Sequence, residues 1–150
     1  MTKPKDPRSD ALPSTDRSLP IALIRAREKV MAPIRDMLSE TGITEQQWRV
    51  LRVLSEGGTL DATEVADRAS LLLPSLTRIV RSLGERGYVT RTQDKEDRRR
   101  QMLAITPAGQ KVIDDNHAEA LRIAQRIRAT LGENNYENLL DLLGALHTFK

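Results

Sequence analysis

The chain has 150 residues, of which 39% are hydrophobic and only 3% aromatic, so a single domain with a lean, mostly aliphatic core is expected. It contains no cysteine, which excludes a disulfide framework, a thiolate metal site and a thiol-based redox switch. No apolar run reaches the ~18 residues of a membrane-spanning helix, and the start lacks the apolar core of a signal peptide. These features predict a cytoplasmic protein with no membrane partner.

The positive charge is concentrated in one segment. The formal net charge is +3, but residues 72–106 hold eight basic and four acidic side chains, whereas the rest of the chain holds 16 basic and 17 acidic ones. Such a localised excess is typical of a surface that binds a polyanion. The sequence therefore favours a nucleic-acid partner for this segment.

The N-terminal part divides into a tail and a long helix. Residues 1–18 are rich in Pro, Ser, Asp and Lys and poor in apolar side chains, which predicts a flexible tail. From Leu19 to about Glu40 apolar pairs recur at helical spacing, so a long amphipathic helix is predicted, bent or irregular near Pro20 and Pro33 and ended by Gly42.

Two capped helices are predicted next. Thr44-Glu45-Gln46-Gln47 has the form of a capping box, and the helix that it opens runs to about Ser55 with Trp48, Leu51 and Leu54 buried. After the break at Gly57-Gly58, Asp61-Ala62-Thr63-Glu64 has a similar cap and opens a short third helix.

A fourth helix, whose two faces differ sharply, starts at Pro74, where a missing amide costs little, and ends at the left-handed Gly87. Its buried stripe has i, i+3, i+4, i+7 spacing and consists of Leu76, Ile79, Val80 and Leu83. The opposite, outward face is expected to carry Ser75, Thr77, Arg78, Arg81 and Ser82.

A charged hairpin follows this helix. Strand-like runs at 88–91 and 102–105 flank the tip Asp94-Lys95-Glu96-Asp97-Arg98-Arg99-Arg100. Thr106-Pro107 then caps a long helix whose expected inward residues include Ile113, Ile123, Ala124 and Leu131, and Gly132 separates it from a last helix.

The predicted fold is mainly α with a small β-hairpin wing. A winged helix-turn-helix at about 44–106 is bracketed by dimerisation helices at 19–42 and 107–150, all within one domain covering 19–150. The terminal helices have wider apolar faces than one small module can cover, so a two-fold homodimer is expected.

At this point the chain resembles a known family. The spacing of several short motifs is similar to that of the MarR family of winged-helix transcriptional regulators, over roughly Leu19 to Leu146. Segments 22–28 and 44–49 are most similar to the regulators of homoprotocatechuate degradation, the HpaR or HpcR group. The family motifs lie at Val80, Leu83, Gly87-Tyr88-Val89, Asp94, Asp97-Arg98-Arg99, Leu103, Ile105-Thr106-Pro107 and Gly109.

The resemblance implies how this chain would contact double-stranded DNA. The fourth helix would enter the major groove, with Ser75, Thr77 and Arg78 near base edges and Arg81 on a phosphate or a guanine. The wing would lie over the minor groove. There the family pattern puts Arg99 in the groove, with Arg98 on the backbone, Asp97 orienting a guanidinium, and Arg100 on a phosphate or in solvent. Ser75 could equally be only part of the helix start, and Thr77 could equally form a hydrogen bond to the nearby backbone.

The resemblance also implies a small-molecule effector, namely an aromatic or phenolic carboxylate at the junction of the dimerisation and DNA-binding parts. A guanidinium can donate two parallel hydrogen bonds to a carboxylate, and an indole can stack on a ring. Alternatively, the arginines are solvated or pair with Glu28, Asp36 and Glu45, and the tryptophan belongs to the core. The candidate effector residues are Arg25, Arg27, Trp48, Arg49 and Arg52.

The sequence is compatible to different degrees with three classes of function. The favoured one is a DNA-binding regulator, most simply a repressor of a pseudopalindromic operator, although the sequence leaves repression and activation open. The alternative is a ligand-independent architectural or protein-interaction module. An enzyme is disfavoured, because no nucleophile elbow or phosphate loop is present and His117 and His147 lack catalytic partners. No cofactor and no metal site are expected, because His117 has no second histidine at ligand spacing.

Overall fold

The computed structural model describes residues 11–150. They divide after Pro33 into two compact units. The first unit holds a 3-10 turn, η2 (Thr15–Arg17), and most of α1 (Leu19–Leu38), which contains Pro33. Ten residues of the expected tail lie outside the described residues, and within the remainder the η2 turn is exposed local structure that the composition did not predict.

After the last turn of α1, the second unit continues with the capped helix that the sequence predicts. In α2 (Glu45–Gly57) the Thr44 hydroxyl accepts a hydrogen bond from the Gln47 amide at 3.1 Å, and the Gln47 side chain accepts one from the Thr44 amide at 3.0 Å. This reciprocal pair satisfies two donors that a helix start otherwise leaves open. Trp48, Leu51 and Leu54 are buried, as expected.

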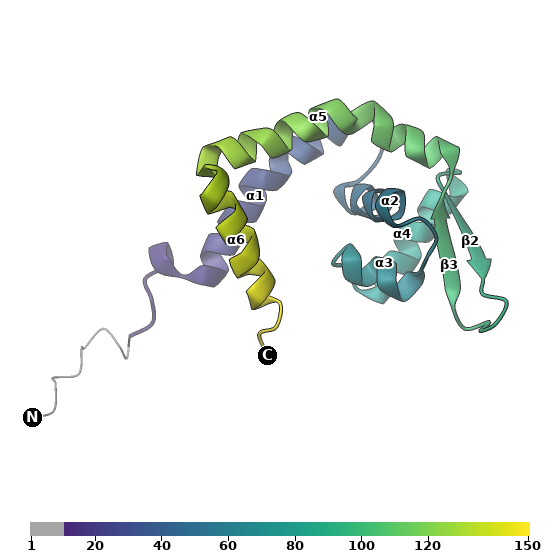
Figure 1. Ribbon diagram of the computed structural model, residues 1–150, viewed down its shortest axis with the longest axis horizontal. Coiled ribbons are helices and arrows are strands. Elements are labelled where there is room, and N and C mark those ends of the chain that lie inside the picture. Colours follow the sequence, from purple (N-terminus) through teal and green to yellow (C-terminus); the bar gives the residue numbers. More distant parts are fainter. Residues whose placement is uncertain (1–10) are drawn as a thin grey trace, which may run out of the picture. The chain divides into compact units, whose positions relative to one another are not determined.

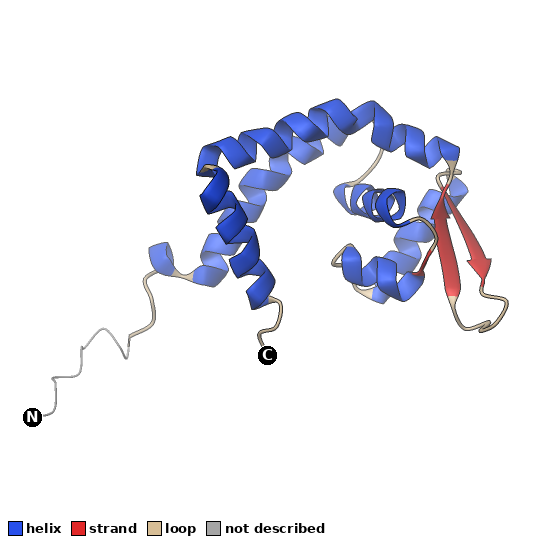
Figure 2. Ribbon diagram, viewed as in Figure 1, coloured by secondary structure: helices blue, strands red, loops and turns tan. Residues whose placement is uncertain are grey.

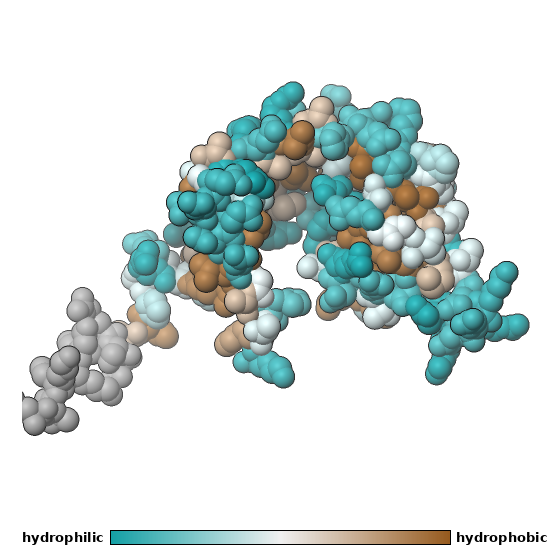
Figure 3. All heavy atoms as spheres, in the orientation of Figure 1, coloured by the Kyte–Doolittle hydropathy of each residue, from teal (hydrophilic) through white to brown (hydrophobic). Residues whose placement is uncertain are grey.

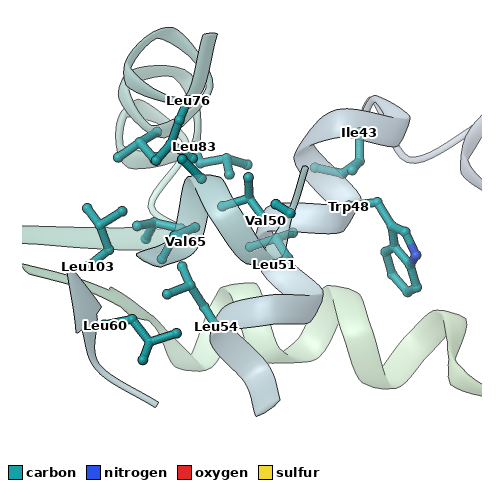
Figure 4. Close-up of a cluster of buried hydrophobic side chains, with 14 of the residues drawn as sticks. Ile43, Trp48, Val50, Leu51, Leu54, Leu60, Val65, Leu76, Leu83 and Leu103 are labelled. Atoms are coloured by element: carbon teal, nitrogen blue, oxygen red, sulfur yellow. The ribbon is translucent and has the colours of Figure 1, made fainter. Parts of the chain in front are cut away.

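Three helices and the sheet enclose one core. Asp61 caps α3 (Ala62–Arg68), and α4 (Leu73–Glu85) follows after a short turn with Pro74 in its first turn. Figure 4 shows their buried leucines and valines converging, with Trp48 at one end of the cluster. The completely buried large side chains are Leu51, Leu54, Leu76, Leu83, Leu103, Val50, Val65 and Val80.

The wing belongs to a three-stranded antiparallel sheet (Figure 2). Strands β2 (Val89–Gln93) and β3 (Gln101–Ile105) form the predicted hairpin, with Arg91 opposite Leu103. On the other edge of β3 lies β1 (Leu60–Asp61), where Leu60 pairs with Leu103 and Asp61 with Met102. The sequence did not predict β1, because two residues are too short to show an alternating pattern and their partners in β3 lie 43 and 41 positions away.

Two further helices complete the second unit (Figure 1). The Thr106 hydroxyl caps α5 (Pro107–Leu131), and Gly132, with φ +84°, ends it before α6 (Glu133–Leu146). Ile113 and Ile123 are buried as expected, but Ala124 and Leu131 are exposed, so the inward face of α5 is narrower within this chain than the spacing predicted. No residue of α6 is buried.

Candidate DNA-binding surface and ligand pocket

The exposed face of α4 is built by the position of its buried stripe. Leu76, Val80 and Leu83 face the core, which turns Thr77, Arg78 and Arg81 to the surface. Within the described residues neither arginine has a hydrogen bond or an ion pair, so both guanidinium groups are available to a partner. Ser75 is half-buried at the start of this face.

Two hydroxyl groups on α4 have local roles. The Thr77 hydroxyl donates to the Leu73 carbonyl at 3.0 Å, as in the local reading of this residue, although its side chain stays exposed. The Ser82 hydroxyl accepts a hydrogen bond from the Gln47 side-chain amide at 3.2 Å and is half-buried. Ser82 therefore ties α4 to α2 and is not part of the outward face to which periodicity assigned it.

The wing tip is a set of hydrogen-bonded turns. The Asp94 amide donates to the Arg100 carbonyl at 2.9 Å, and the Arg100 amide to the Asp97 carbonyl at 3.0 Å. The Asp94 carboxylate also accepts from the Glu96 amide at 3.1 Å. These bonds give the charged segment a defined shape, and Figure 3 shows it as a hydrophilic projection from the molecule.

Two arginines of the wing tip pair with carboxylates, and Arg99 is the more exposed of them. Its side chain is 92% exposed, and Nε lies 3.2 Å from Oδ1 of Asp97, an oxygen that also accepts from the Arg99 amide at 3.1 Å. The side-chain hydrogen bond and then the backbone one lower the pKa of Asp97. Asp97 therefore stays ionised and orients Arg99 outward. Arg98 beside it is exposed.

Arg100 behaves differently from its two neighbours. Its Nη2 lies 2.9 Å from Oδ2 of Asp61, and its Nη1 lies 3.3 Å from Oδ2 of Asp94. The bond to Asp61 is the main reason why the pKa of Arg100 is raised. The sequence predicts Asp61 only as a helix cap, and no pattern in the chain links it to the wing.

A pocket of about 440 Å³ lies between α2 and α5. Trp48 lies on its wall and is 5% exposed, while Arg52 is half exposed and pairs with Glu56 at 2.7 Å. The lining residues are Trp48, Arg52, Ser55, Glu56, Gln110, Ile113, Asp114, His117, Ala120, Leu121 and Ala124.

The pocket brings together two of the five expected effector residues, Trp48 and Arg52. Arg49 does not line it, because its Nη1 donates to the Ala69 carbonyl at 2.8 Å and its Nε lies 3.0 Å from a Glu45 carboxylate oxygen. Arg25 and Arg27 are exposed on the part of α1 that belongs to the first unit. Their assignment stays a prediction.

Several pocket residues were not predicted. Ser55, Gln110, Asp114 and His117 add polar groups to the lining, and the Ser55 hydroxyl donates to the Gln110 side-chain oxygen at 2.9 Å. The signal was present in the spacing, because 110, 113, 117, 120 and 124 form one helical stripe. The stripe was not recognised as a helix face because some of its residues are polar.

Residues 11–150 contain no group of three or more His, Cys, Asp or Glu side chains placed to hold a metal ion. None of their helices combines the length and the apolar character needed to cross a bilayer.

A helix-turn-helix followed by a wing, with cationic side chains exposed on both, defines a winged-helix DNA-binding regulator. The family model for the MarR family matches residues 43–100, which span the helix-turn-helix and most of the wing. The regulator FarR of Neisseria gonorrhoeae is 39% identical over 133 residues, which cover 89% of this chain and 91% of FarR. The chain belongs to the MarR family of transcriptional regulators, so the resemblance found in the sequence is confirmed.

Other relatives agree in sequence and in fold. The homoprotocatechuate degradative operon repressor of Escherichia coli is 33% identical over 84% of this chain and 85% of its own length. The structure of NadR in complex with 4-hydroxyphenylacetate superposes with a TM-score of 0.80 at 37% identity and covers 93% of this chain and 99% of NadR. The repressor CouR bound to a 23-mer DNA duplex superposes with a TM-score of 0.77 at 26% identity, covering 91% of this chain and 99% of CouR. The predicted winged-helix fold is confirmed.

Proposed function

We propose that this regulator is a repressor that binds a pseudopalindromic operator as a two-fold dimer. The observation that carries the proposal is the set of unpaired or outward guanidinium groups on α4 and the wing, namely Arg78, Arg81, Arg98 and Arg99. In the proposed complex α4 lies in the major groove with Ser75, Thr77, Arg78 and Arg81 toward the DNA, and Arg99 lies in the minor groove. The relatives named as repressors and the DNA complex of CouR support this arrangement.

A dimer suits the operator because two recognition helices one DNA turn apart, about 34 Å, read two half-sites. The apolar side chains that α6 leaves exposed support self-association. They are Leu139, Leu140, Leu142, Leu143 and Leu146.

We further propose that a small aromatic carboxylate releases the repressor by binding between α2 and α5. The cavity volume of about 440 Å³ suits a ligand of this size. Arg52 is placed to bind the carboxylate in exchange for Glu56, and Trp48 offers an aromatic wall. The 4-hydroxyphenylacetate bound by NadR supports this class of ligand. Release from DNA requires that the ligand bind more tightly to a form of the dimer whose recognition helices are not one DNA turn apart.

We propose no enzymatic activity for the protein and assign the polar groups of the pocket to orienting a ligand. The chain has no cysteine that could act as a nucleophile. A ligand-independent winged-helix module remains the alternative function, and the effector experiment below separates the two.

The DNA proposal is tested by fluorescence anisotropy with an operator selected from a random duplex library. Arg99→Ala should weaken binding about 10-fold and leave the fold unchanged. Arg122→Ala, which removes another exposed arginine from α5, is the charge-matched control and should bind like the wild type. Equal affinity of Arg99→Ala and the wild type would refute the wing assignment.

The effector proposal is tested by adding 4-hydroxyphenylacetate to the protein–operator complex. Arg52→Gln should bind DNA normally but resist release, whereas Arg25→Ala tests the other predicted arginine. If only the Arg25→Ala protein resists release from the operator, the carboxylate of the ligand binds at α1. If no phenolic acid releases the wild type, the ligand-independent module is the better description.

A further inference from the structure

Arg100 joins the wing tip to the body of the DNA-binding unit. Its guanidinium contacts two carboxylates, one from Asp94 at the start of the tip and one from Asp61 in the edge strand β1. Asp61 lies 39 positions away in the chain, so this contact fixes the tip to an element outside the hairpin. Within the described residues no other wing-tip side chain has an ion pair to a residue outside residues 94–100.

Asp61 is itself held at a junction of three elements. Its Oδ1 accepts the Glu64 amide at 2.8 Å and so caps α3, its backbone pairs with Met102 of β3, and its Oδ2 contacts Arg100. Asp61 is therefore held through its backbone and through both carboxylate oxygens, one of which contacts Arg100.

Hydrogen bonds within the turn link Arg100 to Arg99. The Arg100 amide donates to the Asp97 carbonyl at 3.0 Å, and the Asp97 carboxylate holds Arg99 through its amide and Nε. A displacement of Arg100 therefore displaces the group that orients Arg99. Of the three consecutive arginines, Arg98 and Arg99 are exposed without a contact outside the wing tip, whereas Arg100 is paired with Asp61.

Arg100 is poorly suited to contact DNA directly. Two carboxylates already neutralise its guanidinium, and swinging it to a phosphate would leave Asp61 and Asp94 uncompensated beside a polyanion. We propose that Asp61 and Arg100 are positioning residues, which hold the wing so that Arg99 meets the minor groove, and that neither touches DNA. This inference rests on the proposed DNA-binding function.

The test is Asp61→Asn, measured by anisotropy on the selected operator. Asparagine keeps the oxygen that caps α3 but turns an N–H toward Arg100, so the ion pair is lost while the helix cap stays. Removing a negative charge near DNA should by itself strengthen binding, whereas a displaced wing should weaken it, by about threefold for a partly exposed pair. The two explanations thus predict opposite signs.

Glu96→Gln is the matched control, because it removes the same charge from the exposed wing tip without breaking the contact to Asp61. It should bind at least as tightly as the wild type. In an Arg99→Ala background, Asp61→Asn should change affinity little, because the residue that it positions is gone. Thermal unfolding of each variant checks that α3 stays folded.

Tighter binding by Asp61→Asn, or a threefold loss that persists without Arg99, would overturn the inference. The first result would mean that freed Arg100 contacts a phosphate, and the second that Asp61 acts on another part of the surface. Failure of the proposed function looks different, since the wild type itself would then select no operator.

Discussion

At the residue scale, the three consecutive arginines of the wing tip, residues 98–100, have three different environments. Arg98 is free within the described residues, Arg99 is held outward by Asp97, and Arg100 is paired with Asp61 and Asp94. The motif spacing predicts that Arg99 is the arginine that enters the minor groove of DNA. It could not predict the role of Arg100, because that role depends on a carboxylate brought near by the short strand β1.

The acid sensitivity of Asp61 gives one prediction. The Glu64 amide and then Arg100 lower its pKa below the ordinary 3.8, so ionised Asp61 stabilises the fold above pH 3.8, and this contribution is lost as the pH falls through the lowered pKa. The urea unfolding free energies of wild type and Asp61→Asn should therefore converge between pH 5 and pH 2. A constant difference over this range would contradict the assignment.

Gly109 gives a second prediction at this scale. A Cβ there would lie 2.3 Å from the Tyr88 carbonyl oxygen and 2.8 Å from Ile105, so Gly109→Ala should cost about 1–3 kcal/mol of unfolding free energy. Gly144→Ala is the control, because no atom of the same chain lies within 4 Å of its added Cβ and a helix interior gains ~0.5–1 kcal/mol from alanine. Equal effects of the two substitutions in urea unfolding would show that the close approach costs nothing.

At the element scale, the ends of elements were the most predictable features. The Thr44, Asp61 and Thr106 caps, the left-handed Gly87 and the break between helices at Gly132 all occur where the sequence predicted them, because caps depend on side chains within three residues. Faces were less predictable. Ser82 lies against Gln47 and Ala124 is exposed, since contacts between elements decide both.

The capping box of α2 supplies an element-scale prediction. Thr44→Ala removes the acceptor for the Gln47 amide and should lower the unfolding free energy by about 1 kcal/mol. Thr44→Ser keeps the hydroxyl and is the matched control. A Thr44→Ala protein as stable as Thr44→Ser in urea would mean that the cap contributes nothing measurable.

At the scale of the whole molecule, the candidate site was predicted in part. The basic face of α4 and the wing followed from charge and spacing, but the ligand pocket required the packing of α5 on α2. Only Trp48 and Arg52 of the five expected residues line it. Arg49 is bonded to the Ala69 carbonyl instead, and Arg25 and Arg27 lie on the part of α1 that belongs to the first unit.

Self-association gives the prediction at this scale. The leucines on α6 are 37–66% exposed, so a charge among them should disrupt a dimer built on this helix. Leu143→Glu should sediment as a monomer at micromolar concentration where the wild type sediments as a dimer. Leu72→Glu, whose leucine is 78% exposed at the start of α4, is the control and should stay dimeric. A dimeric Leu143→Glu protein would place the interface elsewhere.

The missing side chain at Gly109 has a mechanical consequence. The first turn of α5 lies so close to the Tyr88 carbonyl that the base of the wing and this helix share one joint, reinforced by the bond from the Thr106 hydroxyl to the Gly87 carbonyl at 2.6 Å. With 25 residues, α5 is a lever ~37 Å long. If its far end is held in a dimer, a tilt of about 5° displaces the wing end by ~3 Å, which is enough to withdraw a guanidinium from a groove.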